Sequence, residues 1–268
     1  MEIYRNLRFF ILINYLELLL TIYRYIMTLP FRFPYRIIKK SVRKKKLKKL
    51  ENYRFRKYCE YLPDIISEPY FVKIGAYDGI TYDPCSDLLL NDKRWKGLLI
   101  EPLNHAFEKL KLNFNDNKRF QLVKTALGGF EGEKKFYYID PNTTNVPLYS
   151  KMIGSFNINH ILKHKSGEFR PFILEGIVRV SRLGNLLERY SIKKIDLLHI
   201  DAESHDYEIL KTLNFDEYIP AIILIEYNHL SKEEFTEMEN LLTINGYELN
   251  DCGIDIFALN KEAYYGLS

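Results

Sequence analysis

Short apolar segments recur along the chain from residue 70 onward, and segments of helical periodicity follow several of them. The apolar segments are residues 70–74, 97–100, 120–124, 195–200 and 221–225, and the expected helices are residues 104–114, 204–213 and 232–245. Continuous apolar strands that alternate with helices are typical of a mostly parallel sheet covered on both faces. Ligands of such sheets bind at the carboxyl ends of the strands. The sequence therefore predicts an α/β fold with its functional residues directly after the strands.

Length and composition fit one α/β domain with an extension. The chain has 268 residues, of which 47% are hydrophobic, and this excludes a disordered chain. The three cysteines, Cys59, Cys85 and Cys252, lie far apart with no Cys-x-x-Cys pair. This pattern argues against a disulfide scaffold or a zinc knuckle and favours a reducing compartment.

The charge is distributed unevenly along the chain. Residues 1–58 carry 16 Lys and Arg against 3 Asp and Glu, a net charge of +13, whereas residues 59–268 carry a net charge of −9. We therefore divide the chain into a basic extension, residues 1–58, and a mildly acidic body, residues 59–268.

The extension joins an apolar helix to a run of positive charge. Residues 9–26 are apolar except for a narrow polar stripe at helical spacing that includes Glu17 and Arg24. Two prolines follow and are expected to end the helix. Residues 36–49 then contain nine Lys and Arg.

A membrane is the partner that this combination favours, with residues 1–49 as the anchor. The basic run stands on the wrong side of the apolar helix for a secretory signal. The helix either crosses a bilayer, where Glu17 and Arg24 are costly, or lies in the interface with the basic run on anionic head groups. The alternative is a helix packed against the body or a second subunit, and the oligomeric state stays open. The Lys and Arg excess places the body on the cytoplasmic side. A nucleic-acid arm fits less well, because the basic residues directly follow an apolar helix.

A glycine-containing loop, residues 75–79, follows the first strand, with Gly75 and Gly79 at its ends. It is not a dinucleotide fingerprint, because Tyr77 and Ile80 occupy two of the three glycine positions, and it is not a phosphate loop, because no Gly-Lys-Ser/Thr follows. Glycine lets the backbone approach a ligand closely. A loop without phosphate-binding basic residues suits a ligand without phosphates, such as S-adenosylmethionine (SAM).

An acid follows the second strand. Glu101 stands 26 residues after Gly75, and Pro102 comes next. A carboxylate at this place accepts hydrogen bonds from both hydroxyls of a ribose. The glycine loop and Glu101 together indicate a SAM site more strongly than either does alone.

Ionisable side chains crowd the ends of the last two parallel strands. They are Asp201, Glu203, His205 and Asp206 after the fourth strand, and Glu226 and His229 after the fifth. Capping of the next helix explains one such residue, but this density at a ligand edge favours a catalytic or metal site. A carboxylate-rich set would suit magnesium, and we assign no metal.

The remaining histidines receive structural interpretations. His199 lies inside the fourth strand and is expected in the core, and His105 is expected at an exposed helix start. His160 and His164 fall in a long insert, about residues 140–176, which we expect to form a lid because long loops in compact domains are often functional.

Five blocks of the sequence resemble the FkbM-type SAM-dependent methyltransferases. The blocks are FVKIGAYDGITYDP (71–84), WKGLLIEP (95–102), Ser155-Phe156 with His164, IDLLHIDAESHDYEIL (195–210) and ILIEYNHLS (223–231). The resemblance covers about residues 66–260 and leaves the extension outside. It implies a seven-stranded, Rossmann-like class I methyltransferase sheet and methyl transfer to a hydroxyl oxygen, commonly of a sugar or a natural product.

The resemblance and the residue patterns together define the expected site. We expect the cofactor at Gly75, Ala76, Tyr77, Gly79, Glu101, Pro102 and Asp201. We expect the acceptor and the catalytic groups at Asp201, Glu203, His205, Asp206, Glu226 and His229. Tyr77 stands where the family usually has a small polar residue, which affects the cofactor contacts expected there. Ser204 replaces a usual glycine and His205 a usual aromatic residue, so the acceptor of a relative does not transfer safely to this chain.

Methyl transfer to an alcohol needs aligned reactants, exclusion of water and removal of the hydroxyl proton. Asp201, which directly follows a strand, is the leading candidate for the base. His205 is the second candidate, because a helix N-terminus lowers the pKa of a histidine. Two other functions remain open: a non-catalytic membrane-tethered adaptor that keeps the fold, and an RNA methyltransferase that uses the basic arm.

Overall fold

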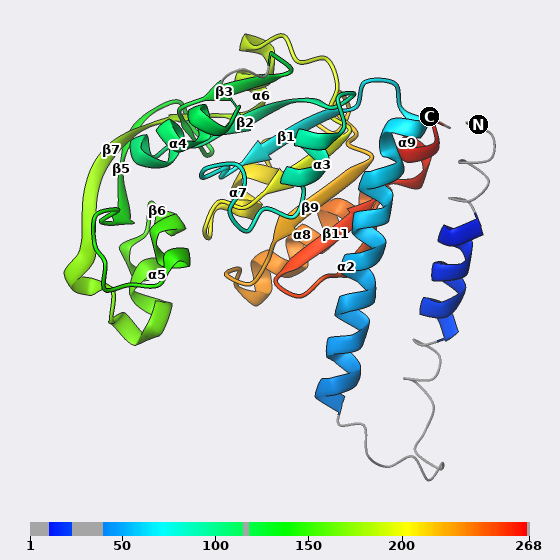
Figure 1. The fold of residues 1–268 in the computed structure, drawn as a ribbon, viewed down its shortest axis with the longest axis horizontal. Helices are drawn as coiled ribbons and strands as arrows, with labels where there is room; N and C mark the ends of the chain where they lie inside the picture. Colours follow the sequence, from blue (N-terminus) through cyan, green and yellow to red (C-terminus); the bar gives the residue numbers. More distant parts are fainter. Residues whose placement is uncertain (1–10, 23–39, 115–117, 267–268) are drawn as a thin grey trace.

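The computed structural model of the chain describes residues 11–22, 40–114 and 118–266. A seven-stranded sheet forms its centre, with the order β10-β11-β9-β8-β1-β2-β3 (Figure 1). Its strands are β1 (Tyr70–Ile74), β2 (Lys96–Ile100), β3 (Phe120–Val123), β8 (Leu197–Ile200), β9 (Ile222–Glu226), β10 (Glu248–Asp251) and β11 (Asp255–Leu259). Neighbours from β9 to β3 pair in parallel, and β11 runs antiparallel to both β9 and β10. The predicted α/β class and seven-stranded sheet are confirmed.

The register of the parallel strands brings their carboxyl ends to one edge. Ile74 of β1 pairs with Ile100 of β2 and with Ile200 of β8, and Ile200 pairs with Ile225 of β9. The residues that follow these isoleucines therefore lie beside one another, although they are far apart in the sequence.

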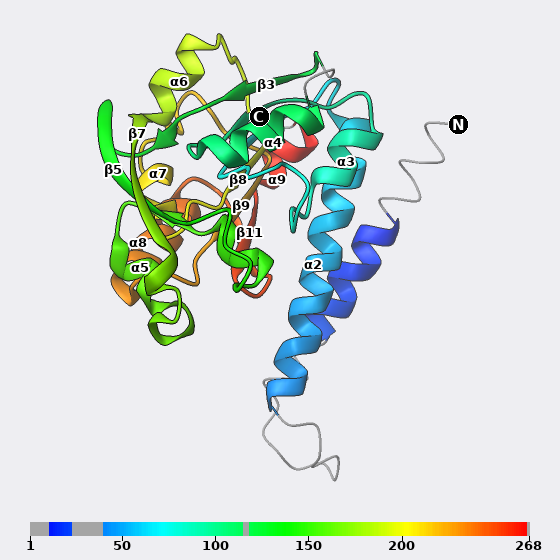
Figure 2. The same cartoon turned by 60° about the vertical axis from the view of Figure 1, so that its left-hand side comes forward.

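Helices cover both faces of the sheet, as the apolar strands require (Figures 1 and 2). One face packs on α6 (Leu183–Arg189), α7 (Asp206–Leu210) and α8 (Lys232–Ile244). The other packs on α2 (Lys40–Ile65), α3 (Ser86–Asn91), α4 (Asn104–Phe114) and α9 (Lys261–Tyr265). The prediction for α4 agrees in both ends, and those for α7 and α8 differ by a few residues.

A second, four-stranded sheet flanks the first and was absent from the sequence prediction. Its order is β4 (Ala126–Leu127), β7 (Ile173–Ser181), β5 (Gly132–Ile139) and β6 (Gly154–Ser155). Strands β5 and β7 pair antiparallel along their whole length. Residues 140–172 lie between them, close to the expected insert, and contain α5 (Ile158–Lys163) at the far end of this arm (Figure 1).

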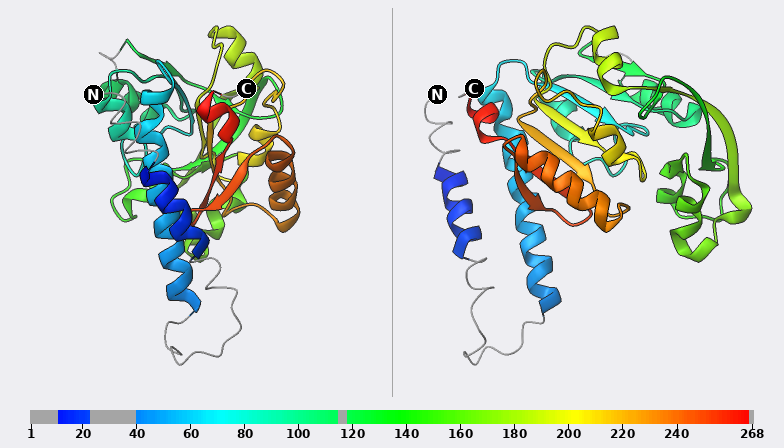
Figure 3. Two further views of the ribbon diagram at one scale, coloured as in Figure 1. Left: turned by 90° about the vertical axis from the view of Figure 1, so that its right-hand side faces the viewer. Right: turned by 180° about the vertical axis from the view of Figure 1, so that it is seen from behind.

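The described part of the extension forms two helices that pack together (Figures 2 and 3). Part of the predicted apolar helix forms a helix over residues 11–22, and the rest of that prediction lies outside the described residues. Helix α2 begins within the basic run and continues without a break across the boundary between residues 58 and 59. The extension and the body therefore share one helix. No helix among the described residues combines the length and the apolar composition needed to cross a bilayer.

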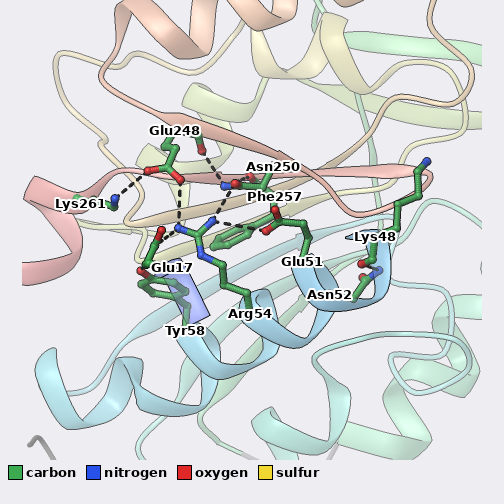
Figure 4. A network of polar contacts seen from close by, with 10 residues as sticks. All are labelled: Glu17, Lys48, Glu51, Asn52, Arg54, Tyr58, Glu248, Asn250, Phe257 and Lys261. Atoms are coloured by element: carbon green, nitrogen blue, oxygen red, sulfur yellow. Dashed lines mark hydrogen bonds and ion pairs between the residues drawn. The ribbon is translucent and has the colours of Figure 1, made fainter. Parts of the chain in front are cut away.

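A buried arginine, Arg54 of α2, holds these elements to the end of the sheet (Figure 4). Its guanidinium donates to the carboxylate of Glu17 on the first helix, to Glu248 Oε1 on β10 at 3.1 Å and to Asn250 Oδ1 on β10 at 2.8 Å. Burial lowers the pKa of Arg54, but the surrounding carboxylates more than offset this effect and raise the pKa above its ordinary value. The arginine is therefore charged and connects three segments.

Loss of this buried cation should destabilise the whole chain. Arg54→Ala leaves carboxylates without their partner, and we expect it to lower the free energy of unfolding by about 3–5 kcal/mol. Arg56→Ala is the matched control, because Arg56 lies on the same helix and pairs with Asp87 at the surface, where an ion pair contributes about 1 kcal/mol or less. Urea denaturation of both variants tests this prediction, and equal losses would contradict it.

Candidate active site at the strand ends

A pocket lies at the carboxyl edge of the parallel strands. Of the predicted site residues, those that line it are Gly75, Tyr77, Glu101, Pro102, Asp201, Glu203 and His205. Met152, Gly154 and Phe156 of the insert close one side of it. The predicted residues Ala76, Gly79, Asp206, Glu226 and His229 are outside this lining.

Packing within the protein explains the two loop glycines. Gly75 has φ +73°, and a Cβ atom there would lie 1.8 Å from the backbone oxygen of Asp201. Gly79 has φ +75°, and a Cβ atom there would collide with Phe114 and Leu110 of α4. The close approach of the backbone after β8 and of α4 therefore requires glycine at these positions. Ala76 is buried in the core beside this loop.

Glu101 is held rigidly inside the pocket. Its Oε2 accepts the backbone N–H of Tyr77 at 2.8 Å, and its Oε1 accepts the N–H of Leu103 at 2.8 Å. The side chain is 5% exposed, and burial raises the pKa of Glu101 to about 7. Each carboxylate oxygen keeps a second lone pair, so the pair of oxygens is able to accept the two hydroxyls of a ribose.

Asp201 faces the pocket above a buried lysine that the sequence prediction missed. Lys73 Nζ lies 3.6 Å from carboxylate oxygens of both Asp201 and Asp83, and 3.1 Å from His199 Nε2. Burial lowers the pKa of Lys73, and the two aspartates more than offset this, so the lysine is charged. His199 is buried as predicted, and burial with the adjacent lysine keeps its pKa well below the ordinary value. A single Lys between Phe71 and Gly75 carried no recognisable signal in the sequence.

Asp206 organises the loop that carries the other acids. Its carboxylate accepts the backbone N–H of Ala202 at 2.8 Å and of Ser204 at 3.2 Å, and the residue is 1% exposed. Burial raises the pKa of Asp206 well above its ordinary value. Ser204 has φ +81°, a conformation that favours glycine. This agrees with the glycine that is usual in the family at this position.

His205 packs its ring against Phe156 of the insert, with ring centroids 4.8 Å apart. Among the described residues, none gives its Nδ1 a hydrogen bond, although this atom is buried. The pKa of His205 is lowered, as predicted. Burial is the main cause, followed by the positive charge of Lys134, and His205 precedes α7 as its N-cap without a side-chain capping bond.

A second group of polar side chains lies beside the pocket. Glu203 Oε2 lies 2.8 Å from His160 Nε2, and His229 Nε2 lies 3.3 Å from Glu226 Oε1. His164 joins this group, with its Nε2 3.4 Å from His160 Nε2.

The two insert histidines correct the sequence prediction, which gave them no specific role. Burial lowers the pKa of His160 and of His164 to about 4, so both rings are neutral at pH 7. The hydrogen bond that His229 donates to the Glu226 carboxylate raises the pKa of His229. The four-residue spacing of His160 and His164, which places both on one helix face, was the signal that could have found them.

The comparisons with known proteins agree with this geometry. The strand order, with one antiparallel strand near the edge, defines the Rossmann-like fold of class I methyltransferases. The family model of the methyltransferase FkbM domain matches residues 73–249. The chain therefore belongs to the FkbM methyltransferase family and has the fold of a SAM-dependent methyltransferase.

Solved structures with a similar fold differ strongly in sequence. The methyltransferase FkbM from Methylobacillus flagellatus KT is 13% identical with a TM-score of 0.47, covering 83% of this chain and 55% of that chain. The precorrin-6y C5,15-methyltransferase from Geobacter metallireducens GS-15 is 10% identical with a TM-score of 0.38, covering 85% and 91%. The N-terminal domain of human METTL16 in complex with SAH is 14% identical with a TM-score of 0.37, covering 91% and 79%. The chain thus spans about half the length of the first of these proteins. No protein of curated function matches the sequence.

The raised pKa of Glu101 should make stability depend on pH in the absence of a ligand. Because the pKa rises from 4.5 to about 7 on folding, the folded chain binds this proton more tightly than the unfolded chain does. Its contribution is complete below about pH 4.5 and is lost as the pH rises to about 7, by at most about 3 kcal/mol. We expect the free energy of unfolding to fall over this range and the Glu101→Gln variant to show a smaller fall.

Chemical denaturation at several pH values measures this effect. Glu108→Gln, at an exposed position of α4, is the control and should follow the wild type. Some pH dependence should remain in Glu101→Gln, because burial also raises the pKa of Asp255 to about 7. An unchanged profile in Glu101→Gln would show that Glu101 titrates as an ordinary acid.

Proposed function

We propose that the chain is a SAM-dependent O-methyltransferase that acts on a hydroxyl of a sugar, a glycan or a related metabolite. The observation that carries the proposal is that one pocket is lined by Glu101 and also by Asp201 and His205. Glu101 suits the ribose of the cofactor, and Asp201 and His205 supply bases for an acceptor hydroxyl. The absence of a cationic side chain from the pocket lining, within the described residues, agrees with a ligand without phosphates.

The pocket fits the cofactor in chemistry. Glu101 would bind the ribose hydroxyls, and the backbone around Gly75 would lie against the amino-acid part of the ligand. Apolar side chains, among them Leu103, Leu127 and Phe136, line the rest of the pocket and suit an adenine ring. When bound, SAM supplies an electrophilic methyl group.

The chain's own residues would position the acceptor and remove its proton. Asp201 is the leading base, because it lines the pocket and its side chain is 42% exposed. The ion pair with the buried Lys73 holds this side chain in position. His205 is neutral and has a buried ring nitrogen, so it is the second candidate for the base. Phe156 and Met152 of the insert would exclude water.

Incubation of the full chain with labelled SAM and separate fractions of cell glycans, lipids and RNA tests this function. We expect label in a glycan or metabolite hydroxyl. Asp201→Asn should lower turnover roughly a hundredfold or more, because it removes the base and keeps the shape. Label only in RNA would contradict the acceptor class, and no turnover with intact SAM binding would favour the non-catalytic adaptor.

Glu101→Ala provides the matched comparison for binding. It removes two hydrogen bonds to a carboxylate, each worth roughly 1.5–3 kcal/mol before water compensates. Calorimetry should therefore show weak SAM binding by Glu101→Ala and near-normal binding by Asp201→Asn. Weak SAM binding by Asp201→Asn with near-normal binding by Glu101→Ala would contradict the assignment of Glu101 to the cofactor and of Asp201 to the base. Unchanged turnover in Asp201→Asn would move the base to His205.

We also propose that the extension holds the enzyme on the cytoplasmic face of a membrane, where SAM is available. Four apolar side chains of the first helix are exposed at helical spacing: Ile11, Tyr15, Leu18 and Ile22. The opposite face, with Ile13, Leu16 and Leu20, is buried. Helix α2 begins within the basic run. Positive charges of this kind are attracted to anionic head groups by about 1 kcal/mol per Lys or Arg. These features support a helix that lies in the membrane interface and packs on α2.

Flotation with vesicles of phosphatidylcholine, with and without phosphatidylserine, tests the anchor. The double variant Tyr15→Ser, Leu18→Ser should bind vesicles at least roughly tenfold more weakly, because it removes apolar surface available for burial in lipid. Ile244→Ser is the control, since Ile244 is 84% exposed on α8 at a distance in sequence from the extension. If the double variant floats as the wild type does, or if the wild type does not float, the anchor is wrong.

A further inference from the structure

Three imidazoles and one carboxylate converge beside the pocket. His160 and His164 come from the insert, Glu203 from the loop after β8, and His229 from the loop after β9. One donor atom from each residue can be chosen so that all four lie within 4.8 Å of one another. His160 is 4% exposed and the other three are partly buried. Segments far apart in the sequence therefore bring four atoms of the kinds that bind metal ions close together.

Three of the six separations between these atoms are close to those of a tetrahedral site. Bonds of about 2.0–2.1 Å to nitrogen and oxygen place neighbouring tetrahedral ligands about 3.3 Å apart. The observed separations are 2.8 Å from His160 Nε2 to Glu203 Oε2, 3.4 Å from His164 Nε2 to His160 Nε2 and 3.8 Å from His229 Nε2 to Glu203 Oε2. These values lie around the expected separation.

Hydrogen bonds alone satisfy this arrangement poorly. If His160 Nε2 carries a proton and donates it to Glu203, it has no lone pair left for His164 Nε2 at 3.4 Å. A neutral imidazole offers one lone pair at one ring nitrogen, which is the form that binds a metal ion. A cation between the four atoms would give each of them a partner at the same time.

We propose that His160, His164, Glu203 and His229 bind one divalent transition-metal ion, with zinc the best suited. Three imidazole nitrogens and one carboxylate oxygen form a set that suits zinc, whereas magnesium and calcium prefer oxygen ligands. The sequence analysis considered a carboxylate-rich, magnesium-type site without assigning a metal, whereas this set is rich in imidazole. Glu226 Oε1, 3.3 Å from His229 Nε2, adds negative charge next to the site.

The ion would fasten the insert to the sheet. Two ligands belong to the arm that carries α5, and two follow β8 and β9, so binding closes a bridge between the two sheets. Glu203 also lines the pocket, and so do Met152, Gly154 and Phe156 of the same insert. The metal would therefore fix the wall of the pocket from outside, and this role does not depend on which acceptor is methylated.

Cobalt(II) is the probe for the site, because its visible absorption reports tetrahedral ligands. The full chain, prepared without a histidine tag and stripped with a chelator, should bind one equivalent of cobalt, which zinc then displaces. His164→Ala should weaken binding by more than the roughly 10–100-fold that loss of an outer partner costs. His105→Ala is the matched control, since His105 lies on α4 outside the cluster, and it should bind as the wild type does.

A second measurement is independent of the variants. Zinc should protect residues 140–172 from hydrogen exchange and from proteolysis in the wild type but not in His164→Ala. Three outcomes would overturn the proposal: no stoichiometric cobalt binding by the wild type, equal binding by His164→Ala, or a thiolate charge-transfer band. The last would place the ion at Asp83, Cys85 and His199, which form another group with suitable ligand atoms.

Discussion

The buried ammonium group of Lys73 compensates the negative charge that collects at the strand ends. Lys73 lies in β1, within the sheet, and forms ion pairs with Asp83 and Asp201. A buried ion is tolerated only where partners of opposite charge offset its desolvation. Asp201, which this lysine contacts, lines the pocket, whereas burial raises the pKa of Glu203 and Asp206 well above their ordinary values. The electrostatics of the site therefore depend on Lys73, a residue outside the pocket lining.

The sequence predicted the centre of the sheet well, because its strands are uninterrupted apolar runs. The ends of those strands located Glu101, Asp201 and Glu226 at one edge, and the register confirms this placement. Strands β5 and β7 escaped prediction, since the first half of β5 is exposed and charged and its partner lies beyond the insert. Sequence periodicity reports local burial, and pairing between distant segments leaves no such signal.

The sequence predicted the site residues that directly follow the strands. It did not predict those that the distant insert contributes. His160 and His164 reach the strand ends only because the insert folds back over them, which no local pattern reveals. For the loop glycines, the sequence predicted the positions but not the interaction that requires them. Their positions were recognised, but the interaction that requires glycine at position 75 is with the backbone of Asp201, from another strand. The same residue type thus serves the fold and leaves room for the ligand.

The contacts of α2 impose an order on folding during synthesis. Arg54 bonds to Asn250, which follows it by 196 positions, and α2 also packs on the terminal helix α9. At about 5–20 residues per second, the ribosome needs roughly 10–40 s to produce those partners after Arg54 is made. During this interval Phe55 and Tyr58 of α2 lack Phe257 and Tyr264, on which their rings finally pack. Helix α2 therefore completes its packing only after most of the body has been made.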